Sequence, residues 1–292
     1  MILVTGASGG VGREVCLALA ARGEQLVLTA RDVARLVALA AEVRAAGGDA
    51  RVLPCDLRDQ HAVAELAETV LAEHGIPEAV VLLAGHSLRR TLEESFGRPH
   101  DLVRLTGTNL LGPAALVLAM LEPMCATGTG RVIAVTSASA RIPTPGWAAY
   151  GASKAALDAW LRALRPQAAR HGVRIAIVEL PLVATAMAAP TYGSAPRGAL
   201  SPADAAGRVL HALDAPRTLI SPPWARAGAV IAQAAPALTA AAAGRAGDLV
   251  RRVAVHGRTG PGAGSIGAST AGGTAGDEPT GRGSTGRRIG PR

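Results

Sequence analysis

The stretch TGASGGVG, residues 5–12, stands between a short apolar run and the first helix-like segment. Its glycines Gly6, Gly10 and Gly12 have the spacing G-x-x-x-G-x-G, which differs from the common G-x-G-x-x-G fingerprint. The physics is shared, because glycines let the backbone approach a pyrophosphate and the following helix N-terminus offers amides and a positive dipole end. Directly after the first strand, such a loop predicts a dinucleotide site in a doubly wound α/β fold.

Working outward from this loop, the chain alternates short apolar runs with longer helical segments. The runs are apolar throughout, which indicates a sheet covered on both faces, as in parallel βαβ units. We therefore predict a Rossmann-type doubly wound parallel sheet of about seven strands. Strands are expected at 2–5, 25–30, 50–57, 78–85, 130–137, 173–180 and 217–221. Helices are expected at 11–23, between the second strand and Gly47-Gly48, and at 59–74, 100–126, 148–171 and 201–213.

Composition narrows the class of protein. The chain has 292 residues and a net charge of +8, but its positive residues are mostly scattered arginines, so we expect no nucleic-acid partner. Its cysteines, Cys16, Cys55 and Cys125, lie far apart in apolar settings and are expected to be buried thiols of a reducing compartment. The start MILVTG does not fit a secretory leader. These features predict a cytoplasmic protein, and no metal site is expected.

The C-terminal part has a different character. Residues 1–222 are predicted to form the nucleotide-binding domain, and residues 223–256 an alanine-rich helical extension with a break at Pro236. Its segment 224–247 is a candidate for peripheral membrane contact. From residue 257 to 292, Gly, Ser, Thr, Pro and Arg dominate. Such a segment cannot bury enough apolar surface to offset its ordering entropy, so we expect a disordered tail.

Two strand ends indicate which dinucleotide binds. An NAD site usually has an acidic residue after the second strand, for the ribose 2′-hydroxyl. Here Thr29 and Ala30 are followed by Arg31, which can meet a 2′-phosphate bidentately and lie over adenine. The alternative is a surface arginine beside Asp32, and we favour NADP(H). Asp56, after the third strand, can reach the adenine amino group.

A third constellation carries the chemistry. Ser137 ends the fifth strand, and Tyr150 and Lys154 are four residues apart on one helix face. An ammonium beside a phenol favours the phenolate, so Lys154 is expected to lower the pKa of Tyr150 from its ordinary value of about 10. Ser137 can hold a substrate oxygen against the phenol. If Tyr150 and Lys154 stood alone, a packing tyrosine with a solvated lysine would be the simpler interpretation. Because the glycine loop is present in the same chain, we favour a catalytic role for the pair.

In this order, TGASGGVG, CDL (55–57), LLAG (82–85), Asn109, Ser137 and YGASK (150–154) resemble the short-chain dehydrogenase/reductase family over residues 1 to 222. The resemblance implies a seven-stranded parallel sheet and a Ser-Tyr-Lys catalytic set. It implies that Tyr150 protonates the carbonyl oxygen as hydride arrives. It also implies that Lys154 binds the nicotinamide ribose and that Asn109 helps to hold a proton-relay water near Lys154.

The residues expected to bind the cofactor come from the glycine loop, the ends of four strands and the catalytic helix. They are Gly6, Ser8, Gly10, Val11, Gly12, Arg31, Asp56, Leu57, Ala84, Gly85, Tyr150, Lys154, Pro181, Val183 and Thr185. The family usually has Asn-Asn at Leu82-Leu83, and this departure puts stability or cofactor affinity in doubt.

A second departure points to the substrate. Where the family commonly has Pro-Gly after the sixth strand, this chain has the uncharged stretch LPLVATAMAAPT, 180–191, whose prolines argue against a regular helix or strand. The stretch resembles the branch containing bacterial fatty acyl-CoA reductases, as do LSPADAA (200–206), AGHSLRR (84–90) and RPHD (98–101). The resemblance implies a loop covering the nicotinamide, with Thr185 near its carboxamide. The loop's apolar side chains, Val183 and Met187 among them, would wall a hydrocarbon slot, although packing against a neighbouring subunit is the alternative.

The sequence thus predicts an NADPH-dependent reductase of a carbonyl, with a fatty acyl-CoA or long-chain aldehyde as substrate. Ser137, Tyr150, Val183 and Met187 are the expected substrate contacts. A 3-oxoacyl reductase or an alcohol dehydrogenase of the same family is the alternative enzyme. A non-catalytic NADP-binding regulatory protein is the rival of another class, for which Leu82-Leu83 and Pro166 inside the catalytic helix argue mildly. The protein is expected to be a homo-oligomer.

Overall fold

The computed structural model describes residues 1–193 and 197–245, which all fall in one compact unit. Seven parallel strands form one sheet in the order β3-β2-β1-β4-β5-β6-β7. The order reverses between β1 and β4, and this switch point is where a doubly wound sheet opens a crevice for ligands. The strands are β1 (Ile2–Thr5), β2 (Gln25–Thr29), β3 (Asp49–Val52), β4 (Ala79–Leu82), β5 (Gly130–Ser137), β6 (Val173–Leu180) and β7 (Leu219–Ile220).

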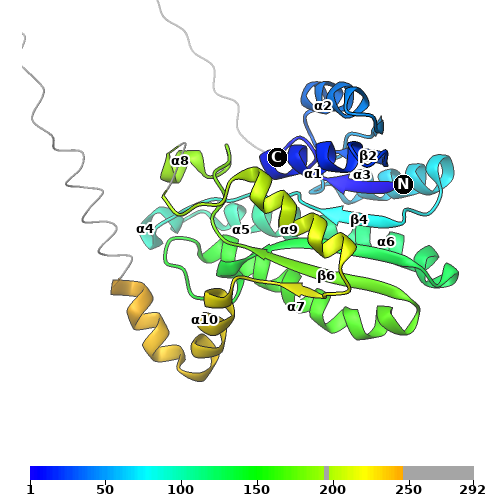
Figure 1. Ribbon diagram of the computed structural model, residues 1–292. Coiled ribbons are helices and arrows are strands. Elements are labelled where there is room, and N and C mark those ends of the chain that lie inside the picture. The colour runs from blue at the N-terminus through cyan, green and yellow to red at the C-terminus, as the bar shows by residue number, and fades with distance from the viewer. Residues whose placement is uncertain (194–196, 246–292) are drawn as a thin grey trace, which may run out of the picture. The chain divides into compact units, whose positions relative to one another are not determined.

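Helices cover both faces of the sheet (Figure 1). One face carries α1 (Gly10–Ala20), α2 (Val33–Ala45) and α9 (Pro202–Asp214), whose buried residues form one core cluster with the strands. The other carries α3 (Gln60–His74), α6 (Gly112–Thr127) and α7 (Ala148–Arg170), which form the second cluster. Shorter segments are α4 (Leu92–Ser95), α5 (Pro99–Thr106), a π-helical turn (Gly107–Leu111), a 3-10 turn (Ala138–Ala140), α8 (Ala189–Tyr192) and α10 (Pro223–Ala234).

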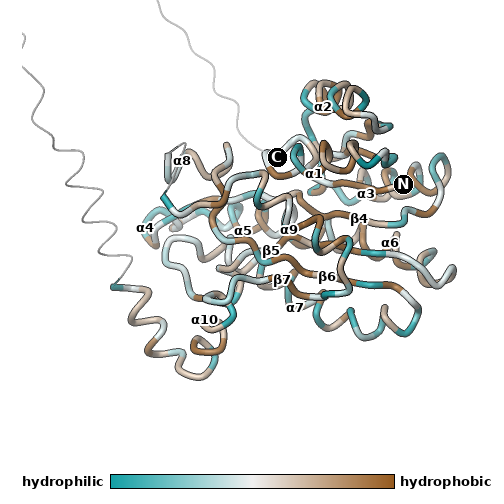
Figure 2. The backbone as a smooth tube through the Cα atoms, in the orientation of Figure 1, coloured by the Kyte–Doolittle hydropathy of each residue, from teal (hydrophilic) through white to brown (hydrophobic). Residues whose placement is uncertain are grey.

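The predicted fold class is therefore confirmed, and the two-sided burial explains the strand sequences. Every residue of β1 and β4 is buried, and the apolar colouring follows the inner strands (Figure 2). Only β3, at the edge of the sheet, has an exposed residue in its middle, Arg51. Cys16 and Cys55 are buried free thiols as expected, whereas Cys125 is only half-buried.

Several predicted boundaries are corrected. The third strand ends at Val52 rather than 57, although the Leu53 and Cys55 amides still donate to the carbonyls of Leu28 and Ala30, where β2 itself ends, and the fourth ends at Leu82 rather than 85. The helix expected at 100–126 is found as one helical segment, Pro99–Thr127, which contains the π-helical turn. Likewise, α7 runs through Pro166 without ending there. The start of α9 is as expected, since Ser201 caps it by accepting from the Asp204 amide at 3.0 Å.

The C-terminal extension is helical in its described part. After α10, a second helical segment covers 236–245. The helix is therefore interrupted at Ala235, next to Pro236, where the break was predicted. The predicted disordered tail, 257–292, lies outside the described residues.

One helical segment, Pro99–Thr127, is long and apolar enough to cross a membrane by length and composition. Its residues Leu105, Leu116 and Met120 are completely buried in the protein. The segment also packs against α3 and α7. Packing in the core accounts for part of its apolarity, because 39% of its most apolar window is buried, whereas Leu102, Val103, Leu111 and Leu118 are exposed.

Candidate active site

A cavity of about 1050 Å³ opens at the carboxyl ends of the strands. Its lining comes from the glycine loop, from the ends of β2, β4 and β5, from α7, and from the segment after β6. Pockets that hold drug-sized ligands span roughly 300–1,000 Å³, so this one has room for an extended cofactor and a substrate beside it. Its place at the switch point of the sheet is the place that the sequence predicted.

The glycine loop has no room for side chains. A Cβ on Gly12 would lie 2.2 Å from the carbonyl oxygen of Gly6. Gly6 itself has φ +66°, and a Cβ there would lie 2.6 Å from the amide nitrogen of Ala84. The loop therefore turns tightly against both α1 and the end of β4. It leaves the N-terminus of α1 facing the cavity, which is the geometry that binds a pyrophosphate.

Arginines gather at the end of the cavity that follows β2 and β3. Arg31 is exposed and lines the cavity, where it can reach an anionic group. Arg35, one helical turn further along, donates to the carbonyl of Ser8 at 2.5 Å and so braces the glycine loop. Asp56 is engaged by Arg58, whose Nε lies 3.0 Å from its carboxylate. The hydrogen bond from Arg58 lowers the pKa of Asp56, so this carboxylate stays ionised beside the arginines.

The hydroxyl groups meet at the end of β5. The Ser137 and Ser139 hydroxyls are 2.8 Å apart, and the Ser139 amide donates to the Ser137 oxygen at 3.2 Å. Burial raises the pKa of the Tyr150 phenol, and a hydrogen bond with Ser137 acts in the opposite direction. The expectation that Lys154 lowers this pKa is therefore not met. The phenol stays protonated at neutral pH, which is the form that donates a proton.

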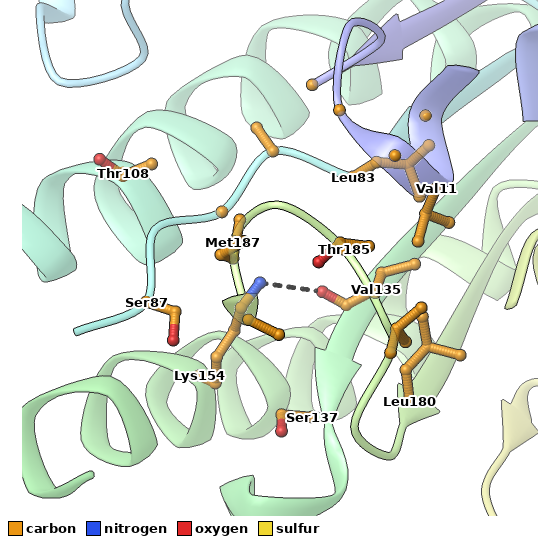
Figure 3. A pocket seen from close by; sticks show the side chains of 18 of the residues that line it. Val11, Leu83, Ser87, Thr108, Val135, Ser137, Lys154, Leu180, Thr185 and Met187 are labelled. Atoms are coloured by element: carbon orange, nitrogen blue, oxygen red, sulfur yellow. Dashed lines mark hydrogen bonds between the residues drawn. The ribbon is translucent and has the colours of Figure 1, made fainter. Parts of the chain in front are cut away.

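Lys154 is buried and approaches the cavity from α7. Its ammonium donates to the carbonyl oxygen of Val135 at 3.1 Å, the contact drawn as a dashed line in Figure 3. Burial lowers the pKa of Lys154 to about 8, because no carboxylate compensates the desolvated charge. Met187 and Thr185 come from the opposite side, from the segment after β6 (Figure 3). Lys154, Tyr150, Thr185 and Met187 thus all line one cavity.

Asn109 is buried behind the cavity rather than in its lining. Its amide nitrogen donates to the His86 carbonyl and to the Ser153 hydroxyl, both at 2.9 Å, and its oxygen accepts from the His86 amide at 2.8 Å. It lies in the π-helical turn, a feature frequent at functional sites. Its side chain thus ties the segment after β4 to Ser153 of α7, the residue next to Lys154.

The segment after β6 roofs the cavity. It begins as a bridge between Val183 and Leu200, and the Ala184 amide donates to the Leu200 carbonyl at 2.9 Å. A Cβ on Gly10 would lie 3.0 Å from Thr185 Cγ2, so the roof touches the glycine loop. The segment ends in the one-turn helix α8, which corrects the expectation of no regular structure. Met187 lines the cavity and stays 49% exposed.

The structure gathers the predicted site residues in one place, since all of them except Asn109 line the cavity. Sequence reasoning missed further lining residues: Arg35, Arg58, Ser139, Ile142, Trp147, Tyr192 and Trp224. For the aromatic members a signal existed, because only 2% of the chain is aromatic. For the others no local pattern distinguishes them from surface residues.

Comparisons with known proteins agree with this geometry. A family model described as short chain dehydrogenase matches residues 1–194. A fatty acyl-CoA reductase of Acinetobacter baylyi is 37% identical over 213 residues, covering 72% of each chain. Another fatty acyl-CoA reductase, of Mycobacterium tuberculosis, is 36% identical over 206 residues, which span 70% of each chain.

Solved structures resemble the chain as well. A metagenomic short-chain oxidoreductase in complex with NADP has a TM-score of 0.65 at 32% identity, over 76% of this chain and 94% of that one. A short-chain dehydrogenase from Sphingobium yanoikuyae in complex with NADPH has a TM-score of 0.71 at 25% identity, over 82% of this chain and 94% of that one.

Proposed function

The chain belongs to the short-chain dehydrogenase family, and from this premise we propose that it reduces the carbonyl of a fatty acyl-CoA or a long-chain aldehyde with NADPH. That it is an NADP-dependent oxidoreductase follows from the family and from NADP-bound neighbours. The observation that carries the finer proposal is one continuous cavity. It joins the glycine loop and Arg31 to Ser137, Tyr150 and Lys154 beneath an uncharged, apolar roof.

The residues present fit NADPH. The crowded Gly6 and Gly12 and the free N-terminus of α1 suit the pyrophosphate, and Arg31 suits the 2′-phosphate. We assign Lys154 to the nicotinamide ribose and Thr185 to the carboxamide, since both line the cavity. When bound, NADPH supplies the hydride.

The chain's own residues supply the proton and hold the oxygen. The Ser137 hydroxyl donates a hydrogen bond to the substrate oxygen, and the Tyr150 hydroxyl transfers its proton to that oxygen as charge develops. Lys154 stabilises the phenolate that remains until a solvent proton restores the phenol. With a thioester, the product of this step is a hemithioacetal, which releases the thiol and leaves the aldehyde.

No covalent thiol intermediate is required. Cys55 lines the cavity, but burial raises the pKa of its thiol to about 11. At neutral pH the group is therefore protonated and a poor nucleophile. Reduction by direct hydride addition agrees with this, because it uses only the hydroxyl and ammonium groups already described.

The alternative enzyme function is a 3-oxoacyl reductase or an alcohol dehydrogenase. Solved neighbours with those names exist, among them a 3-oxoacyl (acyl-carrier-protein) reductase from Agrobacterium tumefaciens with NADP bound, 26% identical with a TM-score of 0.66 over 72% of this chain and 86% of that one. Against a non-catalytic protein, Pro166 does not end α7, and Leu82 is buried in the sheet.

The test is NADPH oxidation by the purified protein across acyl-CoAs, aldehydes and 3-oxoacyl thioesters. Preference for acyl-CoAs or long aldehydes supports the proposal, and preference for 3-oxoacyl thioesters transfers it to the alternative. NADPH binding without oxidation on any substrate would identify a non-catalytic NADP-binding protein.

We also propose that α10 contacts an anionic lipid surface. Trp224, Val230 and Ile231 are 58%, 66% and 55% exposed, and helical spacing places them on one side of α10. Between Asp214 and Arg245 the chain has no acidic residue, which suits an anionic surface. Trp224 also lines the cavity, so this side of α10 adjoins the substrate site.

Sedimentation with vesicles tests this contact. Binding to anionic but not to neutral vesicles, lost in Val230→Asp/Ile231→Asp, supports it. If neither kind of vesicle binds, the proposed lipid contact is wrong. If the unmodified protein is a dimer and the double variant dissociates it, this side of α10 contacts a second copy of the chain instead of lipid. The expected homo-oligomer remains a proposal, which light scattering of the purified protein tests.

A further inference from the structure

The aromatic residues of this chain are concentrated at one cavity. The chain has three Trp, two Tyr and one Phe. Four of these six line the cavity: Trp147, Tyr150, Tyr192 and Trp224. Only Tyr150 has a role in the chemistry described above. A chain that uses aromatic residues so sparingly elsewhere places the other three where they meet a ligand.

Trp147 connects the catalytic tyrosine to the roof. It directly precedes α7, and its ring meets that of Tyr150 edge-on, with centroids 5.8 Å apart and planes at 68°. On its other side it stacks on Tyr192, with centroids 6.0 Å apart and planes at 8°. Tyr192 is the last residue of α8, so this stack links the end of the roof to the wall that carries Tyr150.

The stack matters because the end of the roof has few other attachments. Among the described residues, the backbone hydrogen bonds of 188–193 stay inside the segment, as Ala188 and Ala189 donate to Thr185 and Tyr192 donates to Ala188. The bridge to Leu200 and the contact with Gly10 lie at the other end, at 183–185. An aromatic pair shifts an equilibrium by roughly two- to tenfold, enough to favour a closed roof and still let it open.

The two rings also narrow the space around the reacting oxygen. Tyr192 is close enough to Tyr150 to raise its pKa, an effect smaller than that of burial and of the Ser137 hydrogen bond. Met187 lines the same cavity from the roof. A substrate carbonyl that reaches Tyr150 therefore has flat, rigid rings beside it, which leave room for an unbranched chain and crowd a substituent next to the carbonyl.

We propose that Trp147 and Tyr192 are specificity-determining residues: their stack closes the roof over the substrate and selects carbonyl compounds that are unbranched next to the carbonyl. This inference deepens the proposed reductase function and rests on it for the identity of the substrate. The closure itself does not depend on that identity, so it can be measured without any substrate.

The first measurement is hydrogen–deuterium exchange of 183–193 in the NADPH-bound protein. Tyr192→Ala and Trp147→Ala remove the stack and are expected to speed exchange of 188–193 by about two- to tenfold. Tyr192→Phe keeps the ring and is expected to exchange like the unmodified protein. Equal exchange in Tyr192→Ala and Tyr192→Phe overturns the closure, whatever the enzyme reduces.

The second measurement compares decanal with 2-ethylhexanal as substrates, as a ratio of kcat/KM values. Trp147→Ala is expected to lower the preference for decanal by about tenfold or more, chiefly by admitting the branched aldehyde. Tyr192→Phe is expected to keep the ratio. An unchanged ratio in Trp147→Ala overturns the selectivity. If exchange changes as expected and neither aldehyde is reduced, the closure stands and the proposal that the protein reduces long-chain aldehydes fails.

Discussion

The floor of the cavity, formed by the glycine loop, the end of β5 and α7, is held by close backbone packing at Gly6 and Gly12 and by hydrogen bonds such as that of Lys154 with Val135. Its roof, formed by residues 181–192 and Trp224, is apolar and half exposed. Lys154 is 5% exposed and bonded to Val135, whereas Met187 is 49% exposed. A floor so constrained suits a cofactor of fixed shape. A roof of adaptable apolar groups suits a hydrocarbon and is free to vary without disturbing the chemistry.

The largest expected effect is on the floor. Tyr150→Phe removes the proton donor, so turnover should fall by at least about 100-fold while NADPH binding persists. Steady-state rates and a fluorescence titration with NADPH measure the two effects. Serving as control, Tyr192→Phe removes the other tyrosine hydroxyl of the chain. A near-normal rate in Tyr150→Phe would show that another group protonates the oxygen.

Lys154→Met tests how much the buried charge of Lys154 lowers the free energy of unfolding. With its pKa lowered from 10.5 to about 8, Lys154 binds its proton less tightly in the folded than in the unfolded chain. Below pH 8 the folded state must therefore hold an unfavourable charge, and Lys154→Met should raise the free energy of unfolding by up to about 3 kcal/mol.

The sign of the pH dependence follows from the same shift. Between pH 8 and 10.5 the unfolded chain binds more protons, so the unmodified protein gains stability relative to the variant as pH rises. Urea unfolding of both proteins at pH 7 and pH 9.5 should show the gap shrinking. A gap that is the same at both pH values would contradict a charge buried without compensation.

Arg31→Ala tests the exposed end of the cavity that follows β2, where we expect the 2′-phosphate. Loss of a charge-assisted contact with the 2′-phosphate should weaken NADPH binding by about 10- to 100-fold and leave NADH binding nearly unchanged. Dissociation constants for both cofactors measure this. The matched control is Arg22→Ala, an exposed arginine paired with Asp214 and absent from the cavity lining. Equal affinity of the unmodified protein for the two cofactors would remove the basis for the assignment.

The smallest expected effect, and the most selective, is on the roof. If the roof walls an acyl slot, each buried methylene should add about 0.8 kcal/mol until the slot is full. Met187→Lys should then lower kcat/KM for long substrates by about tenfold, with little change for short ones or for NADPH affinity. An efficiency indifferent to chain length, with all substrates affected equally, would make the roof a structural lid and favour a small-carbonyl reductase.

The sequence alone determined the fold and most of the floor. Local patterns were sufficient there, because the residues involved are close together in the sequence. Crowding of the backbone requires glycine in the loop, and Tyr150 and Lys154 are one helical turn apart. The same local reasoning was wrong for the end of the third strand, and it did not show the π-helical turn inside the 100–126 helix. In both places backbone hydrogen bonding in the folded chain decided the outcome.

Only the tertiary structure decided what surrounds the chemistry. It placed Asn109 behind the cavity, raised rather than lowered the pKa of Tyr150, and stacked Tyr192 on Trp147 across 45 residues of chain. Burial and ring contacts depend on what the rest of the chain packs around a residue. Two residues far apart in sequence carry no local mark of the partner that they meet, so these properties exist only in the folded molecule.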